Sequence, residues 1–190
     1  MFIQTEDTPN PATLKFLPGL TLLDKGTIEF KNKQDAKNNK LADILFSEKN
    51  VEGVFIGKDF LTVTKSEAVE WEGLKPKILS IILDFFSSGG SIEQSEIKDN
   101  NKQVNDIKYS KKDQEIVDKI RELLEERIKP AVAQDGGDIN FVRLEKGIVF
   151  LELRGACSGC PSSTITLKSG IENMLKYYIP EISSVEAINQ

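Results

Sequence analysis

The sequence predicts an α+β protein made of two small α/β-sandwich-like domains joined by a flexible polar linker. Strand-like runs alternate with amphipathic helical stretches along the chain. A length of 190 residues is enough for two small hydrophobic cores. Between about residues 88 and 112 the chain is polar and shows no sustained apolar period. We therefore expect domains at residues 1–87 and 113–190, with the linker at 88–112.

The first domain is expected to contain a strand followed by a hairpin. Alternation of polar and apolar residues at Thr27–Lys31 predicts the strand. Residues 51–56 and 60–64 are rich in β-branched and aromatic side chains, which favour strands. The turn residues Gly57-Lys58-Asp59 lie between these two runs, so we expect the runs to pair as a hairpin.

Two helices complete this domain. The shorter helix is indicated by an apolar face formed by Leu41, Ile44 and Leu45. The longer helix is expected to hold Pro76 in its first turn, where proline is tolerated. Its apolar face is formed by Ile78, Leu79, Ile82, Phe85 and Phe86. We interpret the single tryptophan, Trp71, as a packing residue.

The second domain begins with an amphipathic helix. Its apolar stripe is formed by Ile116, Ile120, Leu123, Leu124 and Ile128. Pro130 is expected to kink or end this helix, because proline has no backbone N–H. Strand-like runs at 139–144 and 148–153 follow, and Lys146-Gly147 supplies the turn between them.

A last helix and a last strand complete the order α-β-β-α-β. The helix is expected over about residues 163–178, and Pro180 ends it. Its inward-facing side chains are predicted to be Ile165, Leu167, Ile171, Met174, Leu175 and Tyr178. The strand at 185–188 should join the sheet through a right-handed crossover, which gives a sheet of about three strands.

Composition and charge exclude several classes of function. The net charge is -5 and both halves are acidic, so the chain lacks the basic surface of a nucleic-acid-binding protein. No apolar run approaches the ~20 residues that span a bilayer, so we expect no membrane partner. Residues 1–7 lack the features of a signal or transit peptide. We therefore expect a cytoplasmic bacterial protein or a mature organellar one.

Cys157 and Cys160 are the only cysteines of the chain, and histidine is absent. In an unexported protein, two cysteines this close are more typical of metal binding or redox chemistry than of a structural disulfide. A soft metal or an iron–sulfur cluster needs about four thiolate or imidazole ligands. One chain supplies only two, so two chains would have to share a bound metal.

The two cysteines fall between a predicted strand and a predicted helix. Unpaired N–H groups at a helix N-terminus stabilise thiolates and the sulfurs of an anionic cluster. Gly159 permits a tight turn, and Pro161 suits a first helical position. The candidate helix caps are Ser162, Ser163 and Thr164. Arg154 either adds positive charge that lowers the thiol pKa or is an exposed residue at a strand end.

Other interpretations of the cysteine pair stay open. One is a thiol–disulfide oxidoreductase that uses Cys157 and Cys160, although the second domain is shorter than a thioredoxin-like fold. Another is a zinc bridge with four cysteine ligands from two chains. A third is a pair of buried, reduced cysteines, which the Ser, Gly and Pro residues around them disfavour.

The remaining polar motifs do not indicate catalysis. Asp135 and Asp138 are candidates for metal or acid–base chemistry, but a helix end followed by a turn explains Asp-Gly-Gly-Asp better. The glycine pair also lacks the spacing of a phosphate-binding loop. The first domain has no cysteine, no histidine and no recognisable catalytic constellation. These motifs therefore add no catalytic candidate to the cysteine pair.

Several runs of residues carry a resemblance to one family. In the second domain they are Ile128-Lys129-Pro130, Asp135-Gly136-Gly137-Asp138-Ile139 and Gly155-Ala156-Cys157-Ser158-Gly159-Cys160-Pro161-Ser162-Ser163, with Thr164 and Leu167. In the first they are Thr5-Glu6-Asp7-Thr8-Pro9-Asn10-Pro11, Leu14-Lys15-Phe16-Leu17-Pro18-Gly19, residues 54–65 and Trp71. Apart from the linker, the chain resembles the two-domain form of the NifU-like (Nfu-type) iron–sulfur cluster scaffold and carrier proteins.

The resemblance implies a non-catalytic carrier. Cys157 and Cys160 of two subunits would hold one [4Fe-4S] cluster between them in a homodimer and would pass it to apo iron–sulfur proteins. The donor would be the iron–sulfur assembly machinery. This chain lacks the extra cysteines of the multidomain nitrogen-fixation member, which favours carrying a cluster made elsewhere over assembling one. The first domain is assigned by default to recognising partners or tuning dimerisation.

Overall fold

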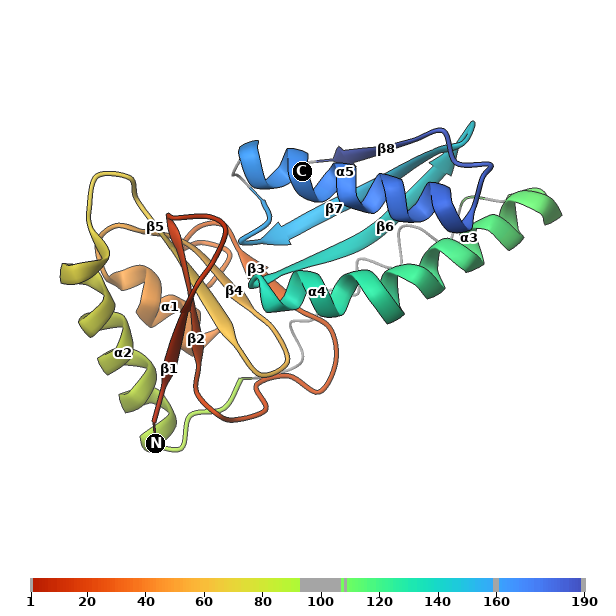
Figure 1. Cartoon of the computed structure of the whole chain (residues 1–190). Coiled ribbons are helices and arrows are strands. Elements are labelled where there is room, and N and C mark those ends of the chain that lie inside the picture. The colour runs from red at the N-terminus through yellow and green to blue at the C-terminus, as the bar shows by residue number, and fades with distance from the viewer. Residues whose placement is uncertain (1, 93–106, 108, 159–160, 189–190) are drawn as a thin grey trace. The chain divides into compact units, whose positions relative to one another are not determined.

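The computed structural model describes residues 2–92, 107, 109–158 and 161–188, with only the backbone described at 161–163. The chain divides into two compact units, Met1–Lys98 and Asp99–Gln190, shown in Figure 1. Much of the expected linker at 88–112 lies outside the described residues, so the limits of the two domains remain a prediction.

The two units have different element orders. The elements of the first unit are β1 (Gln4–Asp7), β2 (Thr13–Leu17), β3 (Ile28–Phe30), α1 (Lys40–Ser47), β4 (Val51–Ile56), β5 (Leu61–Lys65) and α2 (Trp71–Ser87). Those of the second unit are α3 (Lys111–Leu123), the π-helical turn η3 (Leu124–Ile128), α4 (Lys129–Gln134), β6 (Gly137–Glu145), β7 (Ile148–Gly155), α5 (Pro161–Tyr178) and β8 (Ser184–Ile188). Each unit combines helices with one sheet, which confirms the predicted α+β class.

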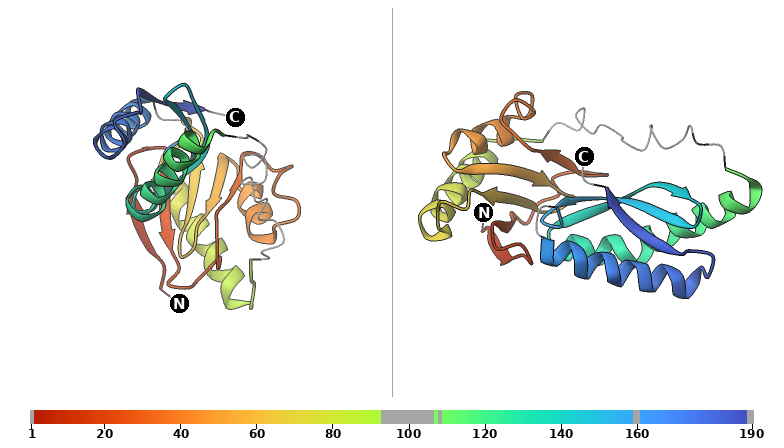
Figure 2. Two further views of the ribbon diagram at one scale, coloured as in Figure 1. Left: turned by 90° about the vertical axis from the view of Figure 1, so that its right-hand side faces the viewer. Right: turned by 90° about the horizontal axis from the view of Figure 1, so that it is seen from above.

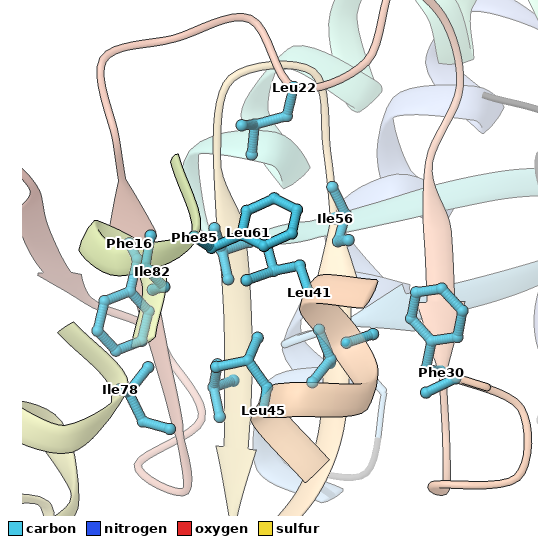
Figure 3. Close-up of a cluster of buried hydrophobic side chains, with 14 of the residues drawn as sticks. Phe16, Leu22, Phe30, Leu41, Leu45, Ile56, Leu61, Ile78, Ile82 and Phe85 are labelled. Carbon is cyan, nitrogen blue, oxygen red and sulfur yellow. The ribbon is translucent and has the colours of Figure 1, made fainter. Parts of the chain in front are cut away.

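The first unit is an antiparallel sheet with two helices over one face. The strand order is β1-β2-β5-β4-β3, and every neighbouring pair is antiparallel. Phe16, Leu61 and Ile56 stand opposite one another across three strands, so their side chains share a face. Figure 3 shows Leu41 of α1 and Ile78 of α2 in the core formed on that face.

The predicted hairpin of the first unit is confirmed. The first two strands of the unit, β1 and β2, were not predicted. β4 pairs with β5, and the Gly57 N–H donates to the Phe60 carbonyl at 2.9 Å across the turn. β1 and β2 are short, and β1 is composed entirely of polar residues. Among the described strands β1 pairs only with β2, and it exposes Glu6 and Asp7, of which Glu6 also contacts Lys15 at 3.1 Å.

Two predictions about the helices of the first unit are wrong. α2 begins at Trp71, so Pro76 lies inside the helix and not in its first turn. Ile44 of α1 is 42% exposed, whereas Leu41 and Leu45 are buried as expected. Trp71 is partly buried against the core, and its indole N–H donates to the Pro11 carbonyl at 3.1 Å. These contacts agree with a packing role for the tryptophan.

The second unit has the predicted α-β-β-α-β order and a three-stranded sheet. β6 and β7 are antiparallel, β7 and β8 are parallel, and the order is β6-β7-β8. Lys146 and Gly147 have positive φ angles of 50° and 79°, which a tight two-residue turn between twisted strands requires. Buried side chains alternate along β7, at Val149, Leu151 and Leu153, and they share one core with residues of α3 and α5. The helices of this unit therefore cover one face of the sheet (Figure 2).

The first helix of this unit changes its hydrogen-bonding pattern before Pro130. α3 is regular, η3 forms one π-helical turn, and α4 carries the proline in its first turn. A proline has no N–H to donate to the preceding turn, so a local change of pattern is expected there. Ile120, Leu124 and Ile128 remain buried through this change, as the sequence predicts.

α5 is rotated relative to its predicted orientation. Ile171 and Leu175 are buried as expected, but Ile165 is 66% exposed and Tyr178 is 44% exposed. The apolar spacing located the helix, whereas its rotation depends on which side chains the sheet accepts. None of the helices in the described ranges combines the length and the apolar character that are needed to cross a bilayer.

Candidate functional site

Cys157 lies in the turn that leads from β7 to α5. Its thiol is free, and its side chain belongs to the core of the second unit, where it is only 5% exposed. This burial differs from the sequence-based expectation of an exposed loop around the cysteines. In the described conformation Cys157 is therefore a core residue as well as a candidate ligand.

Gly137, at the start of β6, packs directly against the Cys157 side chain. A Cβ atom placed on Gly137 would lie 2.6 Å from Cys157 Sγ and 2.7 Å from the Arg154 carbonyl oxygen. Both distances are far shorter than van der Waals contact, so a side chain larger than hydrogen would displace the thiol or the strand. Gly136 has a φ of 80°, which favours glycine, and its carbonyl accepts the Ala156 N–H at 3.2 Å.

Hydrogen bonds tie the Cys157 turn to both neighbouring elements. The Ser158 hydroxyl and N–H both donate to the Gly155 carbonyl, at 2.9 and 3.0 Å, and so close a tight turn at the end of β7. The Thr164 hydroxyl of α5 donates to the Cys157 carbonyl at 3.2 Å. Thr164 lies in the first turn of α5, and its hydroxyl holds the backbone of the cysteine turn. Its predicted role as a helix cap stays a prediction.

The electrostatic surroundings of Cys157 favour the neutral thiol. Burial raises the pKa of Cys157 to about 12, and the negative charges of Asp135 and Asp138 add to this increase. The possibility that Arg154 lowers the pKa of this thiol is not supported, because Arg154 forms an ion pair with Glu152 at 2.8 Å. The site therefore stabilises a protonated Cys157 in this conformation.

Asp135 has the structural role that the sequence favoured, whereas Asp138 is a buried residue of strand β6 and not part of the turn. Asp135 follows the last residue of α4, and its N–H donates to the Ala131 carbonyl at 3.4 Å. Asp138 is 8% exposed, and its carboxylate accepts the Ile139 N–H at 2.8 Å. Their negative charge close to Cys157 was not anticipated.

Cys160 and Gly159 lie outside the described residues, so their predicted roles are untested. The side chains of Ser162 and Ser163 are also outside the description. Within the described part of the chain, no group of three or more Cys, Asp or Glu side chains could hold a metal ion. α5 begins at Pro161, two residues before its expected start.

Sequence reasoning missed Gly137 as a residue of the site. The interpretation of Asp135-Gly136-Gly137-Asp138 as a flexible turn holds only for Asp135 and Gly136, because Gly137 and Asp138 begin β6. Gly137 and Cys157 are brought together because Gly137 stands opposite Gly155 in the antiparallel β6–β7 pair. Counting that register back from the predicted turn at Lys146-Gly147 would have placed Gly137 beside the cysteine turn.

Both units match known families. Residues 3–89 match the family described as scaffold protein Nfu/NifU N terminal, and residues 120–186 match the NifU-like domain. A solution NMR structure of a NifU-like protein from Saccharomyces cerevisiae is 32% identical, covers 50% of this chain and 87% of its own, and has a TM-score of 0.46.

Curated relatives match along almost the whole chain. A Drosophila sechellia protein named NFU1 iron-sulfur cluster scaffold homolog, mitochondrial, is 49% identical over 99% of this chain. Its Drosophila grimshawi counterpart is 49% identical over 98%. This chain spans 65% and 61% of the length of those two proteins. With an Nfu N-terminal domain in one unit and a NifU-like domain in the other, the chain belongs to the NifU-like, Nfu-type family in its two-domain form.

Proposed function

We propose that this protein is an iron–sulfur cluster carrier in which Cys157 and Cys160 of two subunits hold one [4Fe-4S] cluster. The observation that carries the proposal is the ligand count: a chain with two cysteines and no histidine supplies half of the usual four ligands. The family membership and the names of the relatives, which call them iron-sulfur cluster scaffolds, support the same role.

The chemistry of the site is compatible with a cluster as cargo. Thiolates are the ligands that iron–sulfur clusters prefer, and α5 begins at Pro161, so unpaired N–H groups of its first turn would be available to the negative sulfurs. In the described conformation Cys157 is buried and protonated. Loading therefore requires the Cys157 thiol to leave its position over Gly137 and to release its proton.

Shared ligation also provides a route for release. Each subunit holds the cluster through only two cysteines, so two thiolates of an apo-protein can replace one subunit's pair without unfolding either unit. Thiol–disulfide exchange, the alternative, needs the same thiolate as cluster binding, so the raised pKa of Cys157 does not separate the two roles, and the names of the relatives favour the carrier. We therefore assign the protein a non-catalytic role.

The partners follow from this role. The iron–sulfur assembly machinery would donate the cluster, apo iron–sulfur proteins would receive it, and a second copy of the chain would complete the site. The relatives are named mitochondrial, and for this chain the bacterial cytoplasm or an organelle remains a prediction.

The test is anaerobic reconstitution of the full chain with iron, sulfide and a reductant. We expect about two iron and two sulfide per chain in a dimer, which corresponds to one four-iron cluster per two chains. Iron, acid-labile sulfide, zinc and native mass would be measured together. A metal-free monomer would contradict the proposal, and about one zinc per two chains would replace it with a zinc bridge.

Variants of the two cysteines test the assignment of ligands. Cys157→Ser and Cys160→Ser should each lose most of the bound iron while both units stay folded. Ser169→Ala, at an exposed position of α5, is the matched control and should load like the unmodified protein. Full iron and sulfide in either cysteine variant would show that the ligands lie elsewhere.

A further inference from the structure

Within the described part of the first unit, β1 has a neighbouring strand on one side only. It is the first strand in the order β1-β2-β5-β4-β3, so it forms an edge of the sheet (Figure 1). Its register with β2 runs from Gln4 opposite Leu17 to Asp7 opposite Leu14 without a bulge, and β1 contains no proline. Bulges and prolines are common means of blocking an edge strand. The backbone N–H and C=O groups of every second residue of β1 are therefore available to a further strand.

A largely apolar groove lies beside the start of this strand. It has a volume of about 460 Å³, and its lining includes Phe2, Gln4, Leu17, Leu20 and Asp59. Phe2 is 79% exposed and Leu20 is 43% exposed, although both are large apolar side chains. Gln4 and Leu17 stand opposite each other in the β1–β2 pair, so the groove lies at the end of the sheet where β1 begins. A strand added along β1 would bring its own side chains next to this groove.

The uncompensated negative charge of this edge lies at the other end of β1. Asp7, the last residue of the strand, is exposed and forms no ion pair with another described residue. Glu6, by contrast, is paired with Lys15 at 3.1 Å. At the groove, Asp59 follows the exposed Lys58, so the two charges offset each other. The edge therefore has an apolar end at the groove and an acidic end at Asp7.

We propose that β1 binds an extended segment of a partner protein as an additional antiparallel strand. Every neighbouring pair of this sheet is antiparallel, and an antiparallel segment passes Asp7 first and Phe2 afterwards. These two residues are about 17 Å apart along a strand. The segment therefore carries a lysine or arginine opposite Asp7 and, about five residues later, a large apolar side chain for the groove. The inference is independent of the proposed function, because β1 belongs to the unit without cysteines.

The experiment follows the backbone amide signals of the ¹⁵N-labelled full chain by NMR during titration with a short synthetic peptide. The peptide alternates threonine and valine, and it carries a lysine followed about five residues later by a leucine. We expect the amide signals of Gln4–Asp7 to shift as the peptide binds. Replacing the lysine by glutamate should raise the dissociation constant about fivefold, because it reverses one cross-strand charge pair. Replacing the leucine by serine should also weaken binding, because the groove then receives no apolar side chain.

Variants of the protein test the same two contacts. Asp7→Lys should reverse the preference, so that the glutamate peptide binds more tightly than the lysine peptide. Glu122→Lys, at an exposed position of α3, makes the same change of charge in the other unit and should keep the original preference. Phe2→Ser should weaken binding of the leucine peptide but not of the serine peptide. All three side chains are exposed, so urea unfolding should be unchanged.

N-methylated peptides test whether binding occurs by strand addition. Alternate N–H groups of a strand point to opposite sides, so methylation of one alternate set should abolish binding and methylation of the other should not. Equal effects of the two sets, or no shift of the β1 amides at millimolar peptide, would overturn the inference. Shifts of these amides on dilution without peptide would assign the edge to a second copy, and the partner segment would be wrong. A chain that binds the peptide but no cluster would overturn the proposed function alone.

Discussion

At the residue scale, Cys157 and Gly137 depend on each other. The thiol occupies the space that a Cβ atom on Gly137 would fill, at 2.6 Å from Sγ. The glycine therefore determines how deep the cysteine lies, and the burial determines that the cysteine is a neutral thiol. Burial protects the Cys157 thiol in the cluster-free protein, whereas cluster binding would require the same thiol to be exposed and deprotonated.

We expect Gly137→Ala to force the Cys157 side chain out of the core. The cost of such overpacking is about 1–3 kcal/mol in the free energy of unfolding. The measurement is the rate of alkylation by iodoacetamide of the cluster-free protein in a Cys160→Ser background, which should increase. Gly170→Ala is the control, because a Cβ at this helical position meets no atom within 4 Å. An unchanged alkylation rate in Gly137→Ala would contradict the proposed packing.

The raised pKa of Cys157 predicts that the cluster-free protein loses stability at alkaline pH. Below about pH 9, the thiol is protonated in both the folded and the unfolded chain, so the stabilisation is fully present. As the pH rises from about 9 towards about 12, the unfolded chain releases its proton first and the folded state loses this advantage. The slope approaches about 1.4 kcal/mol per pH unit.

The loss of stability is measured by urea unfolding under reducing conditions at pH values from about 8 to about 10.5, where the unfolded chain begins to release the Cys157 proton. Lysine and tyrosine side chains also titrate there, so the quantity to compare is the difference between the unmodified protein and Cys157→Ala. The unmodified protein should lose free energy of unfolding faster than the variant. Parallel pH profiles of the two proteins would show that the thiol is not protected.

At the scale of the element, some features followed from local sequence and others did not. The turn at Lys146-Gly147 was predictable, because two residues with positive φ are a local requirement of a tight hairpin. The exposure of Ile165 was not, because apolar spacing defines a helix face but not which side chains the sheet covers. The burial of Cys157 was missed because it depends on Gly137, which lies twenty residues earlier in the chain.

α2 offers a test of how a helix tolerates an internal proline. Pro76 is exposed and lies inside a helix that begins at Trp71, so it removes one backbone hydrogen bond without contributing to the core. We expect Pro76→Ala to raise the free energy of unfolding of the first unit by about 1–3 kcal/mol, since the helix propensity of alanine is higher. Ser80→Ala, at another exposed position of α2, is the control for urea unfolding followed by circular dichroism. A lower free energy of unfolding in Pro76→Ala would mean that proline stabilises the protein by reducing the conformational entropy of the unfolded chain, and that this effect exceeds its disturbance of the helix.

At the scale of the whole molecule, the two units have separate cores. The buried side chains of the second core all lie between Val117 and Val185, and those of the first between Leu14 and Phe85. The proposed cluster ligands both belong to the second unit, and the first unit contains no cysteine or histidine. The first unit therefore contributes no thiolate to the proposed site.

We expect residues 107–190 alone to fold and to load a cluster as the full chain does. The reason is that every member of the second core is contained in this fragment. Far-UV circular dichroism, urea unfolding and iron per chain are the measurements. A fragment that folds but does not load would show that the first unit is required for the site, and an unfolded fragment would contradict the independence of the two cores.

The acidic edge of the first sheet has a consequence for solubility. A strand that pairs on one side only can template another chain, and an open edge of this kind is the usual start of fibrillar aggregation. Strand β1 exposes Glu6 and Asp7, so two copies that met edge to edge would bring like charges to about 5 Å. Like charges at β1 therefore disfavour the pairing of two copies through this edge of the sheet.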